Sequence, residues 1–232
     1  MDTNENFTGF KSFVIDFLRE LSENNNRPWF TKNKARYEEE VLTPALNYIT
    51  AMIEPFAEIA PNFTAIPKRT SGSLMRIYRD TRFSKDKTPY KTNIGIQFRH
   101  RLAKDVHVPG YYLHIAPQDI FVGIGTWRPP SDALLKIREH IVEFPKKWQS
   151  MLINKKFQNK YTIAGEKLKT APRGFPKDHK LIDDLKRKDF IAVRNLDAAE
   201  IQKSNFIKRS AKLFEAATPF MKFLCDALGI PL

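Results

Sequence analysis

Six cationic side chains and three aromatic ones lie within the eighteen residues from Leu74 to Lys91. The cations are Arg76, Arg79, Arg82, Lys85, Lys87 and Lys91, and the aromatic residues between them are Tyr78, Phe83 and Tyr90. Only Asp80 and Asp86 offset this positive charge. Arginine suits bidentate contacts with phosphate or carboxylate groups, and aromatic rings stack on bases and sugars. The segment therefore predicts a binding surface for an anionic small molecule, formed by the six cations and Tyr90.

Two residues outside this segment belong to the same predicted site. Trp127 follows an apolar, strand-like run and could stack on a base or sugar as Tyr90 could, although packing as a loop anchor is the alternative for both rings. Arg173 precedes Gly174 in the turn-like stretch 172–176 and forms a second cationic tip, and the alternative is that this stretch is only a turn that needs the glycine.

Three side chains are candidates for proton transfer: Asp80, His114 and Tyr78. Asp80 is flanked by two arginines, which should lower its pKa and favour ion pairing over proton abstraction. His114 lies on the polar side of a predicted strand, where a hydrogen-bonded structural histidine is the alternative. If any of them is catalytic, the protein is an enzyme that acts on a phosphate ester or another anionic substrate.

No metal or cofactor is predicted from the sequence. His100, His107 and His114 recur every seven residues, but an odd spacing places successive strand residues on opposite faces. The single cysteine, Cys225, has apolar neighbours at helical spacing and is expected in the core. The chain contains no phosphate-binding or dinucleotide-binding glycine motif, and the pair Gly123 and Gly125 lacks the third glycine and the helix of such a motif.

The net charge of +13 is concentrated in two segments. Residues 66–101 contain ten Lys and Arg against two Asp, and residues 145–188 contain thirteen against four acidic residues. Such asymmetry favours an anionic partner, so nucleic acid binding through both segments is the alternative to a small anion. Solvated lysine-rich loops would have the same composition, and a buried ion-pair network among Arg76, Asp80 and Arg82 would explain the first segment without any ligand.

Length and composition indicate one folded domain over residues 1–232. The chain is 42% hydrophobic and 12% aromatic, enough for a sizeable core. One cysteine permits no internal disulfide, and no apolar run approaches the roughly 18 residues of a membrane span. We therefore expect a cytoplasmic protein without a membrane partner. No feature of the sequence indicates an oligomeric state.

The pattern of apolar residues predicts an α+β fold. Alternation predicts an antiparallel meander of about four or more strands within roughly residues 73–125, with strands at 73–80, 92–98, 110–116 and 120–125. Helical spacing predicts helices at 9–23, from Thr31 to about Pro55 with an interruption at Pro44, at 131–141, at 181–188, and as a C-terminal hairpin broken near Pro219. The N-terminal and C-terminal helices should pack on the sheet and position the cationic segment.

Several short motifs together resemble those of one protein family. They are Gly9-Phe10, Asn26-Arg-Pro-Trp-Phe30, Arg76-Ile-Tyr-Arg-Asp-Thr-Arg-Phe83, Asp86-Lys-Thr-Pro-Tyr-Lys91, Gly110-Tyr-Tyr-Leu-His-Ile-Ala-Pro117, Gly123-Ile-Gly-Thr-Trp-Arg-Pro129 and Ala171-Pro-Arg-Gly-Phe175. In order and content they resemble domain-of-unknown-function family 2461, conserved hypothetical proteins of bacteria and fungi, from about residue 7 to 228. The resemblance implies a single domain. It brings no activity, cofactor or catalytic residue, so the function rests on the residues themselves.

Overall fold

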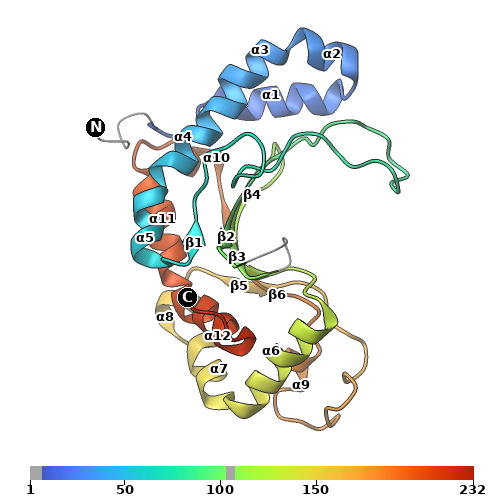
Figure 1. The fold of residues 1–232 in the computed structure, drawn as a ribbon, viewed down its shortest axis with the longest axis vertical. Coiled ribbons are helices and arrows are strands. Elements are labelled where there is room, and N and C mark those ends of the chain that lie inside the picture. The colour runs from blue at the N-terminus through green and yellow to red at the C-terminus, as the bar shows by residue number, and fades with distance from the viewer. Residues whose placement is uncertain (1–6, 103–107) are drawn as a thin grey trace.

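A computed structural model describes residues 7–102 and 108–232, which fold around one six-stranded antiparallel sheet (Figure 1). The strands are β1 (Phe63–Thr64), β2 (Ile94–His100), β3 (Gly110–Ile115), β4 (Ile120–Thr126), β5 (Thr162–Ala164) and β6 (Phe190–Leu196). Their order across the sheet is β1-β2-β3-β4-β6-β5. The predicted α+β class with an antiparallel sheet and flanking helices is confirmed.

Strands β2, β3 and β4 form the central meander that alternation predicted. Each has apolar residues at every second position, as in Tyr111, Leu113 and Ile115 of β3, and these side chains are buried. The intervening side chains, such as Tyr112 and His114, point to the opposite face and are only partly buried. Because the side-chain period of a strand is two, one face enters the core and the other remains open.

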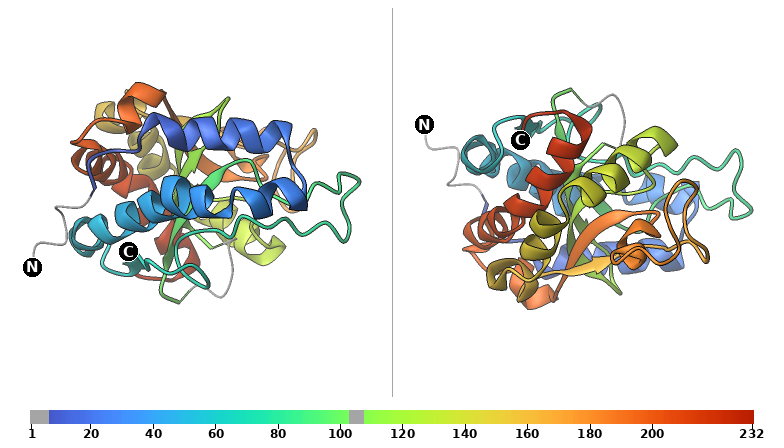
Figure 2. Two further views of the ribbon diagram at one scale, coloured as in Figure 1. Left: turned by 90° about the horizontal axis from the view of Figure 1, so that it is seen from above. Right: turned by 90° about the horizontal axis from the view of Figure 1, so that it is seen from below.

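The predicted strand at 73–80 is wrong. Leu74 makes one isolated bridge to Ile96 of β2, and the chain then leaves the sheet. From Ile77 onward the segment pairs with its own returning half, because the Arg79 N–H donates to the Pro89 carbonyl and the Lys91 N–H to the Ile77 carbonyl. The result is a long irregular hairpin that projects from the body in both views of Figure 2.

Strands β5 and β6 were not predicted from the sequence. Strand β6 pairs with β4 along seven residues, from Ile120 opposite Leu196 to Thr126 opposite Phe190. It therefore occupies the sheet position beside β4, and the chain reaches it only after more than sixty residues from Thr126, which include helices and strand β5. Polar residues, Arg194 and Asn195, lie near its end and a lysine-rich stretch precedes it, which conceals the alternation.

Helices flank the sheet and extend beyond both of its ends (Figure 1). They are α1 (Ser12–Glu23), α2 (Arg27–Lys32), α3 (Lys34–Arg36), the π-helical turn η1 (Tyr37–Leu42), α4 (Thr43–Ala51), α5 (Ile53–Ile59), α6 (Ser131–Glu143), α7 (Pro145–Leu152), α8 (Lys155–Gln158), α9 (Ile182–Leu185), α10 (Ala198–Ile201), α11 (Phe206–Ala216) and α12 (Thr218–Leu228). Within the described ranges no helix is long and apolar enough to cross a membrane.

The core lies between one face of the sheet and helices α4, α5, α11 and α12. Phe56 of α5 contacts Phe98 of β2 with ring centroids 4.3 Å apart, and Phe214 of α11 packs on Tyr111 at 5.4 Å. The prolines set where helices begin. Pro44 follows the π-helical turn, in which the Thr43 N–H donates to the Glu38 carbonyl, and Pro219 opens α12, so both predicted interruptions are present.

Candidate functional site

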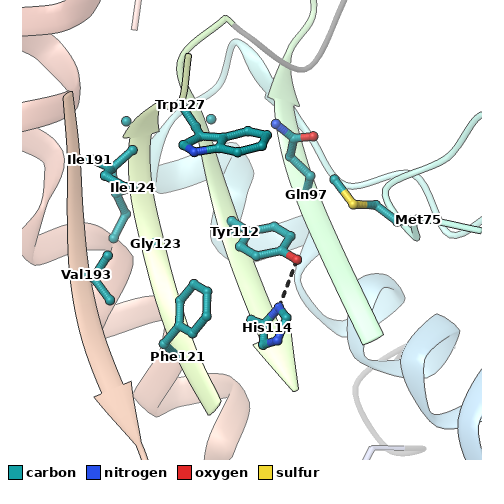
Figure 3. Close-up of a pocket in the computed structure, with 12 residues that line it drawn as sticks. Met75, Gln97, Tyr112, His114, Phe121, Gly123, Ile124, Trp127, Ile191 and Val193 are labelled. Atoms are coloured by element: carbon teal, nitrogen blue, oxygen red, sulfur yellow. Dashed lines mark hydrogen bonds between the residues drawn. The ribbon is translucent and has the colours of Figure 1, made fainter. Parts of the chain in front are cut away.

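A cavity of about 390 Å³ lies on the open face of the sheet (Figure 3). Three rings, those of Tyr112, Phe121 and Trp127, stand around it, and Ile191 and Val193 of β6 form an apolar wall. The opposite side is closed by Met75 and Gln97, and His114 lies at one end. This size and this mostly apolar lining with few polar groups are typical of small-molecule sites.

The register of the strands explains why the sheet is hollow there. Tyr112 lies opposite Gln97 on one side and Gly123 on the other, and Gly123 in turn lies opposite Val193. In the neighbouring row Gly110, Gly125 and Ile191 are partners. Side chains therefore rise from the edges of this patch, while its centre has none. Three glycines from β3 and β4 make the floor of the cavity.

Gly123 and Gly125 are glycines for different reasons. Gly125 has φ +123°, and a Cβ atom there would lie 2.0 Å from the Phe190 carbonyl oxygen, so the backbone requires glycine. A Cβ on Gly123 would meet its nearest neighbours, in Phe121 and Tyr112, only at 3.8 and 3.9 Å, an ordinary contact distance. The fold would therefore accept a larger residue at position 123. Glycine is also unfavourable within a strand, so the strand itself gives no reason for it here. What glycine leaves at this position is open space.

A buried carboxylate holds the turn that carries Trp127. Asp189, 4% exposed, accepts the backbone N–H of Arg128 at 2.7 Å and that of Glu166 at 3.0 Å. Arg128 has φ +49°, which is uncommon outside glycine, and its guanidinium carbon lies 4.7 Å from the centroid of the Trp127 ring. The Trp127 indole is half exposed. It packs against the Arg128 guanidinium and also lines the cavity.

Three polar side chains form an array at the end of the cavity. The Tyr112 hydroxyl lies 3.1 Å from His114 Nδ1, as the dashed line in Figure 3 shows, and His114 Nε2 lies 3.6 Å from an Asp119 carboxylate oxygen. The imidazole also stacks on Phe121, with centroids 4.7 Å apart. Asp119 is largely exposed, whereas the His114 side chain is 17% exposed. The array thus runs from solvent to the apolar interior of the pocket.

The cavity perturbs the titration of these groups. Burial lowers the pKa of His114, and the nearby Asp119 carboxylate only partly opposes this shift. Burial also raises the pKa of the Tyr112 hydroxyl to about 12, with a further contribution from Asp119. Near neutral pH the imidazole is therefore uncharged and the phenol protonated, so the side chains that line the cavity carry no charge.

Two arginines of the predicted anion site form ion pairs with aspartates of the same hairpin. Arg79 forms an ion pair with Asp86, and Arg82 Nη2 lies 2.7 Å from an Asp80 carboxylate oxygen. The hydrogen bond from Arg82, supported by a backbone one, lowers the pKa of Asp80 to about 2, and the bond from Arg79 does the same for Asp86. These carboxylates are ion-pair partners. Phe83, at the same projecting end, is 96% exposed.

The remaining cations of the hairpin are arranged differently. Lys87 Nζ donates to the Thr81 carbonyl at 2.9 Å, and Lys85 is exposed. Arg76 and the half-buried Lys91 are near enough to affect one another, because burial, followed by the Arg76 charge, lowers the pKa of Lys91. Within the two described ranges neither Arg76 nor Lys91 forms an ion pair.

Of the residues predicted to form the site, only Trp127 and His114 line the cavity. Tyr90 is buried and stacks on Phe30 at 4.1 Å, and Tyr78 packs against Tyr90 in a tilted arrangement with centroids 5.5 Å apart. Arg173 lies on the loop between β5 and α9, at the opposite end of the molecule from the hairpin in Figure 1.

Most of the cavity was missed from the sequence. Met75 lies in a segment predicted as a strand, and Ile191 and Val193 lie in an unpredicted one. The signal that was present is the alternation in β3 and β4, which places Tyr112, His114, Phe121 and Gly123 on one face. The sequence does not distinguish Gly123, which leaves open space, from Gly125, which the backbone requires.

Within residues 7–102 and 108–232 no three His, Cys, Asp or Glu side chains come together as ligands for a metal ion. His107 lies outside these residues. His100 is buried, and its Nε2 lies 2.8 Å from the Pro231 carbonyl oxygen, which ties β2 to the C-terminal segment. Cys225 is buried in α12, as expected, and burial raises the pKa of its thiol to about 12.

An open antiparallel sheet with helices on one face and a glycine-floored cavity on the other defines this α+β protein. The sequence model of a family described as "Conserved hypothetical protein (DUF2461)" matches residues 14–223, and the chain belongs to that family. No curated protein and no solved structure matches the chain.

Proposed function

We propose that this protein binds a small, neutral, largely aromatic molecule in the cavity above Gly123. The observation that carries the proposal is the glycine at this position, where the surrounding atoms would accept a side chain. The rings of Tyr112, Phe121 and Trp127 offer faces and edges for a flat ligand, and aromatic pairs add stability beyond the area they bury. A ligand of about ten non-hydrogen atoms would bind with a dissociation constant of about 0.1–1 mM.

Filling the cavity tests this proposal. Ligand-observed NMR with indole, 3-methylindole and phenol should detect binding to the wild-type protein and none to Gly123→Leu, whose side chain would occupy the space over β4. Gln158→Leu adds the same apolar side chain to an exposed position on α8 and should bind as the wild type does. The proposal is wrong if Gly123→Leu is folded and still binds, or if the wild type binds none of these probes.

A second candidate function uses Arg76 and Lys91 as an anion site. Two neighbouring cations, one of them half buried, are costly unless an anion joins them, and neither takes part in an ion pair of the described chain. Inorganic phosphate should then raise the melting temperature of the wild type, and the Arg76→Ala, Lys91→Ala double variant should lose this effect. Arg82→Ala, which removes a cation already paired with Asp80, is the matched control. An equal phosphate effect in all three proteins would exclude the site.

A further inference from the structure

The array at the end of the cavity determines which polar group a ligand should carry. A carboxylate only accepts hydrogen bonds, so Asp119, 3.6 Å from His114 Nε2, favours the tautomer with its proton on that nitrogen. His114 Nδ1 is then an acceptor, and the Tyr112 hydroxyl, 3.1 Å away, donates to it. The single hydroxyl proton of Tyr112 is thereby used in the hydrogen bond to His114 and is not available to a ligand.

The Tyr112 oxygen still has its acceptor capacity, because a hydroxyl has one proton and two lone pairs. Tyr112 lines the cavity, and its hydroxyl lies between the His114 ring and the side of the cavity closed by Met75 and Gln97 (Figure 3). A Cβ atom on Gly95 would lie 2.8 Å from this hydroxyl oxygen, so the missing side chain of Gly95 is what makes room for the phenol end.

We infer that the pocket selects aromatic ligands that bear an N–H or O–H donor, which Tyr112 accepts while His114 and Asp119 hold its proton away from the ligand. This inference deepens the proposed function and rests on it. Tyr112 is the binding residue, and His114 and Asp119 are positioning residues. Ligands of the same shape whose only polar atom is an acceptor leave the Tyr112 oxygen unsatisfied and are bound less well.

Two isomers provide matched probes. 3-Methylindole keeps the N–H donor, whereas 1-methylindole has the same atoms with the methyl group on nitrogen and no donor. Calorimetry or NMR titration at pH 7.5 should give about fivefold tighter binding of 3-methylindole to the wild type, the effect of one net hydrogen bond. Tyr112→Phe keeps the ring and removes the acceptor, so the two isomers should bind it equally.

The positioning role has its own readout. In long-range ¹H–¹⁵N spectra, His114 should show a protonated Nε2 and an unprotonated Nδ1, and Asp119→Asn should shift this tautomer balance and reduce the preference for 3-methylindole. A purely structural role of Asp119 would leave the ratio of the two affinities unchanged. Because Asp119 lies in an exposed turn, its substitution should preserve the fold.

The outcomes separate this inference from the proposed function. Equal binding of both isomers to the wild type, or an unchanged preference in Tyr112→Phe, overturns the donor selectivity and leaves the cavity as a binding site, provided that Gly123→Leu abolishes binding. Failure of both isomers to bind the wild type overturns this inference, and failure of indole and phenol as well overturns the proposed function. A protonated Nδ1 on His114 at pH 7.5 also contradicts the inference.

Discussion

At the scale of single residues, His114 should make stability depend on pH. Burial lowers its pKa in the folded state, while in the unfolded chain a histidine titrates near its ordinary value of about 6.5. Below that value the unfolded state binds more protons, so the free energy of unfolding should fall as the pH drops from 7 toward the folded pKa. The free energy of unfolding is therefore independent of His114 protonation above about pH 6.5 and decreases on acidification below that pH.

His114→Gln should therefore flatten the decrease in the urea midpoint between pH 7 and pH 5. His140, whose pKa burial also lowers, contributes its own share, so a residual slope is expected. A variant with the same slope as the wild type would show that the imidazole is not held neutral in the cavity.

Asp189 is expected to matter more for stability than any exposed acid. Asp189→Ala leaves the buried N–H groups of Arg128 and Glu166 without their acceptor and should cost about 2–4 kcal/mol in urea unfolding. Asp183→Ala, at an exposed position on α9, should change stability by less than about 0.5 kcal/mol. Comparable effects of the two substitutions would argue against Asp189 as the support of the turn at Trp127.

At the scale of elements, two glycines of β4 should respond oppositely to the same change. Gly125→Ala puts a Cβ 2.0 Å from a backbone oxygen at a positive φ and should destabilise the protein by more than about 2 kcal/mol or prevent folding. Gly123→Ala meets only ordinary contacts and should be neutral or stabilising by up to about 1 kcal/mol. Thermal unfolding of both variants checks this, and equal losses would contradict the account of the cavity floor.

Asn25, between α1 and α2, anchors the base of the hairpin. Its side-chain amide donates to the Tyr90 carbonyl at 2.9 Å and accepts the Tyr90 N–H at 3.1 Å. Asn25→Ala should cost about 1–3 kcal/mol and speed amide exchange in residues 77–91. Asn24→Ala is a neighbouring control, because Asn24 Nδ2 donates to the carbonyl of Glu20 in α1. Unchanged amide exchange in the hairpin would show that the stacking of Tyr90 on Phe30 is enough to anchor it without Asn25.

The central strands and the main helices follow from local patterns in the sequence, because alternation in β3 and helical spacing in α1 each report burial on one side. Two features do not follow. Residues 73–80 have strand-like alternation, but from Ile77 onward the chain pairs with its own returning half. Strand β6 lies beside β4 after a long stretch of chain, and no local pattern predicts this pairing. Two sides of the cavity, with Ile191 and Val193 on one and Met75 on the other, depend on these two features.

At the scale of the whole molecule, the two basic segments do not merge. The hairpin of residues 76–91 and the helices α7 to α9 within 145–188 lie at opposite ends of the molecule in Figure 1, with the sheet between them. The net charge of +13 was evident from the sequence, but not this separation. Any anion site at Arg76 and Lys91 is therefore local, and a nucleic acid would have to pass the sheet to contact both segments.

The central claim is that the space above Gly123 is a binding site. The most direct test is calorimetric titration of 3-methylindole into the wild type, Gly123→Leu and the surface control Gln158→Leu, after thermal unfolding has shown that all three are folded. We predict similar affinities for the wild type and Gln158→Leu and no measurable binding to Gly123→Leu. Binding of equal affinity to all three proteins, or to none of them, would contradict the claim.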